Sequence, residues 1–120
     1  THNKKIADIG CGAGFVINPL DGDEKVAIDI SLNQLRHVDS SITRIRANVE
    51  SLPIQDEYFD VVICTDIFEH VQDEKALVEE VSRVLKPGGM LRRKEKYNEG
   101  WIGFNNMGKK FMFAKRIRIY

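Results

Sequence analysis

The sequence has little of several features, and each shortage excludes a class of protein. No apolar run approaches the roughly 20 residues that a membrane-crossing helix needs, so a transmembrane protein is not expected. The chain starts with the polar run Thr1–Lys5, which lacks the features of a signal peptide. Cysteine occurs only at Cys11 and Cys64, 53 positions apart and without metal-ligand spacing. We therefore expect two reduced thiols in a cytoplasmic protein, and no disulfide.

Net charge is also absent, since 18 basic residues balance 18 acidic ones. The balance hides an asymmetry: residues 1–90 hold 9 basic and 16 acidic residues (−7), whereas residues 91–120 hold 9 and 2 (+7). The basic tail fits a solvated face that complements an acidic body, or a surface for an anionic substrate or RNA. Both interpretations stay open here, although no RNA-recognition motif supports the second.

The most informative stretch is a short apolar run, Ile6–Ile9, that leads into three alternating glycines, Gly10, Gly12 and Gly14. Apart from Asp8 the run carries no charge, as expected for the central strand of a parallel sheet. Glycine has no Cβ and adopts positive φ, so such a turn lets the backbone approach a ligand closely. We therefore expect a ligand at the carboxyl end of this strand, with a tight turn that binds nothing as the alternative.

A second buried strand is expected over Lys25–Ile30, and it ends near an acidic residue, Asp29, 21 positions after Asp8. In a strand–helix–strand unit an acid at this point lies beside the glycine turn, where it can accept hydrogen bonds from the two ribose hydroxyls of an adenosine. The alternative is a carboxylate at the solvated end of a strand.

The rest of the chain alternates strands with helices. Further strands are expected at Ile42–Ala47 and Tyr58–Cys64, and helices at Phe15–Leu20, Leu32–Val38 and Asp73–Lys86. Pro19 keeps the first helix brief or kinked, Ser31 and Asp73 are N-caps, and Pro87–Gly89 ends the last helix. A chain of 120 residues buries about two thirds of its unfolded surface, enough for one core. We therefore expect a single α/β domain with a doubly wound, mostly parallel sheet.

Four stretches occur together in the order and spacing of one known family. They are Asp8–Gly14, Val26–Ser31, Leu52–Ile54 with Phe59–Val62, and Leu85–Gly89. In these the chain resembles the class I S-adenosylmethionine-dependent methyltransferases, of the small-molecule type (methyltransferase domain 11-like). The resemblance covers about residues 5–90. It implies a Rossmann-like methyltransferase fold, S-adenosylmethionine as cofactor and a small-molecule methyl acceptor.

The resemblance also implies which residues hold the cofactor. Asp8 and the backbone of Gly10, Cys11 and Gly12 would meet its methionine end. Asp29 would hold the ribose.

On the adenine side, Ile30 would lie against one face of the ring. Asn48 stands where the family usually has an Asp that hydrogen-bonds the adenine amino group, and Asn keeps one acceptor. Val49 would offer its backbone N–H to the ring. The carbonyls near Cys64 and Thr65 would face the cofactor's amino group.

The chain departs from the family after Pro87–Gly89. An apolar strand normally follows, but here Met90 and Leu91 lead into the charged run Arg92–Lys96, which a central strand cannot carry without partners. The family's N-terminal helix and substrate-binding insertion have no counterpart either. We therefore expect residues missing near 90/91 or a truncated domain, with a core at 5–90 and a divergent basic part at 91–120. Trp101–Phe104 and Lys110–Tyr120 are expected to form a C-terminal antiparallel hairpin.

His70 is the candidate catalytic residue, because it follows the fourth expected strand at the mouth of the expected crevice. If the acceptor is a hydroxyl, His70 could take its proton as a general base, helped by Asp66 or Glu69. A His here can also simply pack or cap. Glu69 and His70 alone are too few ligands for a metal site, so none is expected.

Three other functions stay open. A cofactor-binding module without catalysis would bind S-adenosylmethionine but form no S-adenosylhomocysteine. A nicotinamide-dependent oxidoreductase fits less well, because the glycines run G-x-G-x-G and Pro87–Gly89 is left unexplained. An RNA-binding module would use the basic tail and show salt-dependent affinity. Neither the acceptor nor the oligomeric state follows from the sequence.

Overall fold

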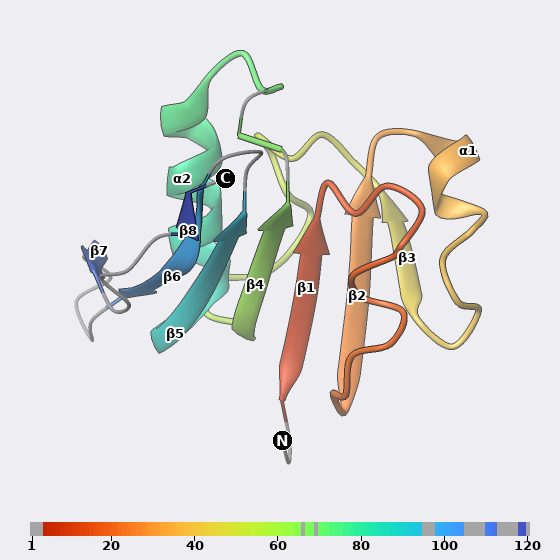
Figure 1. The fold of residues 1–120 in the computed structure, drawn as a ribbon, viewed down its shortest axis with the longest axis horizontal. Helices are drawn as coiled ribbons and strands as arrows, with labels where there is room; N and C mark the ends of the chain where they lie inside the picture. Colours follow the sequence, from red (N-terminus) through yellow and green to blue (C-terminus); the bar gives the residue numbers. More distant parts are fainter. Residues whose placement is uncertain are drawn as a thin grey trace.

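The computed structural model describes residues 4–65, 67–68, 70–94, 98–104, 110–112 and 118–119, with side chains through residue 93. Its strands form one sheet in the order β3-β2-β1-β4-β5-β6-β7, with β8 beside β6 (Figure 1). The parallel strands are β1 (Lys5–Ile9), β2 (Glu24–Asp29), β3 (Thr43–Arg46), β4 (Phe59–Thr65) and β5 (Leu85–Lys94). This five-stranded parallel sheet confirms the predicted Rossmann-like architecture.

The two helices in the described part of the chain lie on opposite faces of the sheet. On one face, α2 (Glu74–Val84) buries Leu77, Val81 and Val84 against the central strands. On the other face, α1 (Leu32–Leu35) and the β1–β2 connection pack Leu35 and Ile17 against Ala27. Neither helix is long and apolar enough to span a membrane. Both layers leave the carboxyl ends of the strands at one common edge.

The β1–β2 connection differs from the prediction, since residues 15–19 form turns and not a helix. Asn18 N donates to Gly14 O at 2.8 Å, which is one helical hydrogen bond, but Pro19 has no N–H to continue the series. The helix after Ser31 is also shorter than expected. Ser31 Oγ accepts from Gln34 N as predicted, while Val38 N bonds to Leu35 O in a tighter turn.

The end of α2 is a second correction. Asp73 caps the helix as predicted, through its Oδ1 and Ala76 N at 3.0 Å. The helix ends at Val84, before Pro87–Gly89, because Leu85 is extended and begins β5. Leu85 pairs with Phe59 and Met90 with Val61, so the Pro-Gly-Gly element forms an irregularity in this ladder.

β5 continues through the basic cluster where missing residues or a truncation were expected. Its residues from Met90 to Lys94 pair with β4 on one side and with β6 (Asn98–Phe104) on the other. Arg93 has the partners that such a strand requires: its guanidinium carbon lies 3.9 Å from the centre of the Phe68 ring, and its Nη2 lies 3.2 Å from Glu74 Oε1. These contacts explain how a charged residue fits at this position.

The C-terminal strands are described in part. β6 contains Trp101–Phe104 and is antiparallel to β5, to β7 (Lys110–Met112) and to β8 (Arg118–Ile119). The expected strand over Lys110–Tyr120 falls largely on residues outside the described ones.

Candidate functional site

The glycine turn at the end of β1 has a shape that lets a ligand approach the backbone closely. Gly10 N and Cys11 N both donate to Ile28 O, at 2.8 and 3.0 Å, which holds the turn against the end of β2. Gly10 has φ +74°, and a Cβ there would lie 2.7 Å from Ile67 Cδ1. Gly12 has φ +55°, and a Cβ there would meet no described atom within 4 Å. The turn therefore needs glycine at both positions and leaves open space beside Gly12.

Asp29 joins the glycine turn to the end of β2. Its Oδ2 accepts a hydrogen bond from Gly12 N at 2.9 Å, and its Oδ1 accepts one from Ser31 N at 2.8 Å. The carboxylate therefore lies beside the glycine turn, where the sequence placed it. Two carboxylate oxygens offer about four acceptor positions, so two remain for a ligand.

Asp8 is an unusual residue for the centre of a sheet. Its side chain is 1% exposed, and its Oδ1 has no hydrogen-bond partner among the described residues. Burial, together with the nearby negative charge of Asp29, raises the pKa of Asp8 from 3.8 to about 7. An unpartnered buried acid is costly to the fold, which is typical of a residue kept for a ligand.

The two cysteines are free, as predicted. Burial and the neighbouring carboxylate of Asp8 raise the pKa of Cys11 to about 12, and its Sγ lies 3.3 Å from Gly12 O. Burial also raises the pKa of Cys64, on β4. Both thiols therefore stay protonated and poorly nucleophilic at neutral pH.

The adenine-side residues line the same edge of the sheet. Ile30 directly follows β2 and is 60% exposed, so its apolar surface is free to meet a ligand. Ala47 N donates to Asp29 O at 3.1 Å, which holds the segment that leads to Asn48 beside β2. Asn48 is exposed, but its Oδ1 accepts from Glu50 N at 2.8 Å. Val49 is buried in the core, and Thr65 ends β4.

The structure thus brings the predicted residues together to different degrees. Asp8, Cys11, Gly12 and Asp29 form one cluster linked by short contacts and charge. Asn48 and Val49 lie one strand further out, beyond β2, and within the described part of the chain no hydrogen bond links their side chains to the glycine turn.

His70 lies in the connection from β4 to α2. Its side chain is exposed, and its backbone N–H donates to Ile67 O at 3.0 Å. The acids expected to assist it, Asp66 and Glu69, lie outside the described residues. Its role as a general base remains a prediction.

Sequence reasoning missed Ile67, whose side chain packs against Gly10. Its only signal was its place three residues after a predicted strand.

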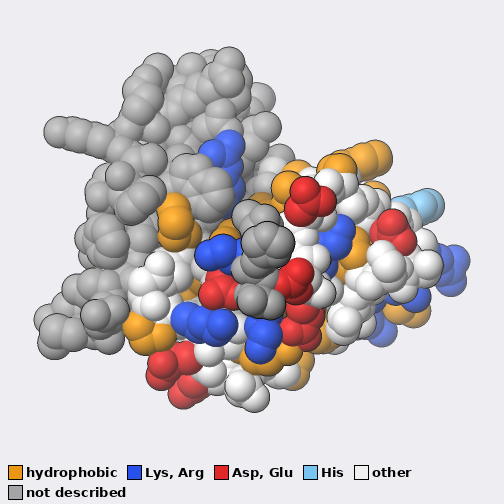
Figure 2. Space-filling view, turned by 90° about the horizontal axis from the view of Figure 1, so that it is seen from below, with side chains coloured by type: hydrophobic (Ala, Val, Ile, Leu, Met, Phe, Trp, Pro, Cys, Tyr) orange, Lys and Arg blue, Asp and Glu red, His pale blue; other side chains and the backbone are white. Residues whose placement is uncertain are grey.

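The opposite edge of the sheet looks different. Acidic and basic side chains intermingle on the described part of that face, which Figure 2 shows from the amino ends of the strands. For example, Asp60 accepts from Lys5 N at 2.9 Å and pairs with Lys86 at 3.4 Å. This mixture offers no field of one sign for an anionic partner.

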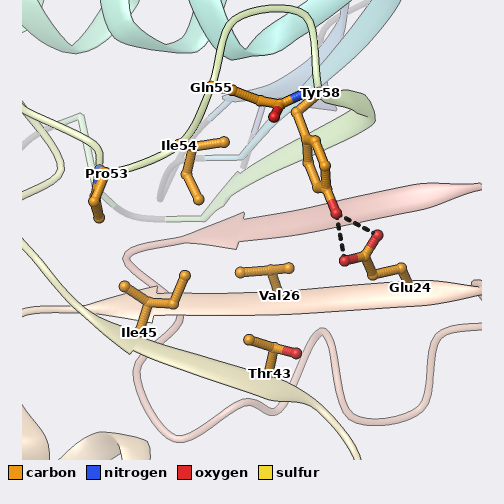
Figure 3. A pocket seen from close by; sticks show the side chains of 8 residues that line it. All are labelled: Glu24, Val26, Thr43, Ile45, Pro53, Ile54, Gln55 and Tyr58. Carbon is orange, nitrogen blue, oxygen red and sulfur yellow. Dashed lines mark hydrogen bonds between the residues drawn. The ribbon is translucent and has the colours of Figure 1, made fainter.

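A groove of about 240 Å³ also lies toward the amino ends, over β2 and β3 (Figure 3). Val26 and Ile45 form its floor, Ile54 is in its wall, and the Tyr58 hydroxyl donates to the Glu24 carboxylate at its end. Arg83 fixes this wall through Ile54 O at 2.7 Å. None of the predicted site residues lines the groove.

The similarity to known proteins covers the part of the chain that contains the candidate site. A family model described as a methyltransferase domain matches residues 7–92. An uncharacterised protein of Methanocaldococcus jannaschii is 40% identical over 93 residues, which cover 75% of this chain and 41% of that protein. A ubiquinone biosynthesis O-methyltransferase of Xylella fastidiosa is 35% identical over 97 residues, which cover 72% and 39%. The chain thus spans about two fifths of the length of these relatives.

A solved structure gives the same picture. A SAM-dependent methyltransferase of Thermotoga maritima superposes with a TM-score of 0.69 at 26% identity, covering 75% of this chain and 43% of that one.

Proposed function

The chain belongs to the class I S-adenosylmethionine-dependent methyltransferases, and on that premise we propose that it binds this cofactor at the carboxyl ends of β1 and β2 and transfers a methyl group to a small molecule. The cofactor is that of the family. The observation that carries the site is the link from Gly12 N to the Asp29 carboxylate, close to the buried Asp8, whose Oδ1 has no hydrogen-bond partner in the described part of the chain.

The residues present fit such a cofactor. The open space beside Gly12 admits a ligand to the backbone, and the Oδ1 of Asp8, which no described group contacts by a hydrogen bond, offers an acceptor to a positively charged group. We propose that Asp8, Gly10, Cys11 and Gly12 hold the methionine end and that Asp29 holds the ribose. Ile30, Asn48 and Val49 would then hold the adenine, and Thr65 the amino group.

The chemistry asks little of the chain beyond positioning. When bound, S-adenosylmethionine supplies a methyl group on a positively charged sulfur, which leaves without being protonated. The chain's part is to hold the acceptor in line, a proximity effect that is worth several kcal/mol, up to ~7–11 in favourable cases. For a hydroxyl acceptor, His70 would also accept the proton.

We infer a hydroxyl acceptor. The support is the 35% identity to a relative named as an O-methyltransferase of ubiquinone biosynthesis, together with the place of His70 after β4. A phenol or catechol is the simplest probe of that class.

The test is formation of S-adenosylhomocysteine from S-adenosylmethionine and catechol. We expect turnover by the wild-type chain and a loss of about 10²-fold in kcat for His70→Ala, the usual contribution of a general base. His37→Ala removes another exposed histidine, which follows α1 and has no proposed role in proton transfer, and it should leave kcat unchanged. Binding without turnover would favour the alternative function, a cofactor-binding module that does not catalyse.

We further propose that residues 1–120 form one cytoplasmic domain whose C-terminal part completes the sheet as an antiparallel hairpin. The antiparallel pairing of β6 with β7 supports the hairpin. The two free thiols support the cytoplasmic location.

A further inference from the structure

The burial of the Asp8 carboxyl group is not explained by cofactor positioning alone. A carboxylate that only accepted hydrogen bonds would be cheaper at a solvated strand end, but Asp8 lies in the middle of the sheet, in register with Ala27 and Ile63. Its Oδ1 is buried without a partner in the described part of the molecule. A charge in such surroundings is disfavoured, so in the free protein the acid stays neutral to a higher pH than an exposed aspartate does.

Among the described residues, no cation stabilises the ionised carboxylate of Asp8. The described titratable and charged groups that bear on this site are Asp29 at the end of β2, Cys11 in the glycine turn, Cys64 on β4, Lys25 on β2, and Arg92 and Arg93 on β5. Arg93 acts on Cys64, but its guanidinium packs on Phe68 and pairs with Glu74. Asp29 is negative and the thiols are neutral. Lys25 Nζ donates to the carbonyls of Ile17, Asn18 and Leu20, and Arg92 is in register with Ile63, on the far side of β4 from β1.

We propose that Asp8 holds a proton in the free protein and releases it to solvent when the positively charged end of S-adenosylmethionine binds, so that cofactor binding is coupled to the loss of one proton at this side chain. The inference rests on the proposed function. A cation close to a buried carboxylate favours its ionised form, so the ligand itself provides the charge that the fold lacks. The O–H bond of Asp8 breaks, the proton goes to the buffer, and no other bond changes.

The coupling has a direct thermodynamic consequence. Because Asp8 must lose its proton to bind, the affinity for S-adenosylmethionine should fall as the pH drops below about 7, by up to tenfold per pH unit. Above that value Asp8 is already ionised in the free protein, and it should contribute no further pH dependence to the affinity. The pH of the surroundings would thus set how much cofactor the chain holds.

The experiment is calorimetric titration of S-adenosylmethionine at one pH in two buffers with different ionisation enthalpies, since the difference in heat counts the protons released. At pH 6.5 we expect more than about half a proton per site, and at pH 8.5 less than about a tenth, from a carboxyl that titrates near 7. Asp8→Asn should bind more weakly, release no proton and show no pH dependence. Asp60→Asn removes a carboxylate at the opposite edge and should release as many protons as the wild type.

The outcomes separate the two proposals. Binding of the wild type with equal heats in both buffers at pH 6.5 would overturn the proton exchange and leave the proposed function standing. An absence of binding at both pH values would overturn both. Proton release that persists in Asp8→Asn would assign the exchange to another group and reject Asp8.

Discussion

Asp8→Asn should make the free protein more stable at pH 8, by up to roughly 4 kcal/mol. The pKa of Asp8 lies at about 7 in the fold and at 3.8 in the unfolded chain, and each unit of that difference corresponds to about 1.4 kcal/mol. Asparagine has nearly the same shape and carries no charge. Most substitutions at a fully buried position destabilise the protein. A gain in stability here would therefore show that the wild type keeps Asp8 at a cost in stability.

The stability advantage of Asp8→Asn should grow with pH. The folded protein binds the proton of Asp8 more tightly than the unfolded chain does, so the wild type is most stable when Asp8 is protonated. That stability is fully present below about pH 4, declines as the pH rises, and is lost above about 7. The advantage of Asp8→Asn should therefore be near its minimum at pH 4 and reach its maximum at pH 8, measured by urea unfolding.

Asp60→Asn is the matched control, because it should behave in the opposite way. Although partial burial alone would raise the pKa of Asp60, hydrogen bonds from Lys5 N and Lys86 Nζ hold it below its usual value. Asp60→Asn should thus destabilise the protein at neutral pH and lose that effect in acid. If the advantage of Asp8→Asn did not grow between pH 4 and 8, Asp8 would be ionised in the fold without penalty, and our account of it would be wrong.

Asp29→Ala should weaken the binding of S-adenosylmethionine by about 10²-fold at pH 8. The variant loses the carboxylate that would accept from the ribose, and it leaves Gly12 N and Ser31 N without their acceptor. Hydrogen bonds to a charged group contribute about 1.5–3 kcal/mol each, so losing the ribose contacts alone accounts for this factor. Calorimetry at pH 8, where Asp8 is ionised, isolates the effect of Asp29.

Two comparisons sharpen this prediction. Asp29→Asn keeps one acceptor oxygen and should lose less affinity than Asp29→Ala. Asp39 is an exposed acid that accepts from Ser41 N, two residues on, just as Asp29 accepts from Ser31 N. Asp39→Ala should bind the cofactor like the wild type, and equal affinities for Asp29→Ala and Asp39→Ala would remove Asp29 from the site.

The elements that sequence reasoning placed well have strong local signals. Short, nearly continuous apolar runs located β1, β2 and β4, the Asp73 cap located α2, and the acid at the end of β2 was predicted beside the glycine turn. These features depend on residues close together in the chain. They can therefore be predicted from the sequence without knowledge of the rest of the fold.

The features that sequence reasoning missed depend on distant partners. The helix before Pro87 ends early because Leu85 pairs with Phe59, a strand away in the sheet. Arg93 fits in β5 because Phe68 and Glu74 come to it from the β4–α2 connection and the start of α2. The protonation of Asp8 follows from its burial, which no local pattern reveals.

The most direct test of the account is the thermal and urea stability of the wild-type chain with S-adenosylmethionine and with NAD. A ligand at 100 times its dissociation constant adds ~2.7 kcal/mol to the free energy of unfolding. We predict that S-adenosylmethionine stabilises the folded chain by this amount at pH 8 and that NAD has no effect. Stabilisation by NAD, or none by S-adenosylmethionine, would contradict the placement of an adenosyl sulfonium at the glycine turn.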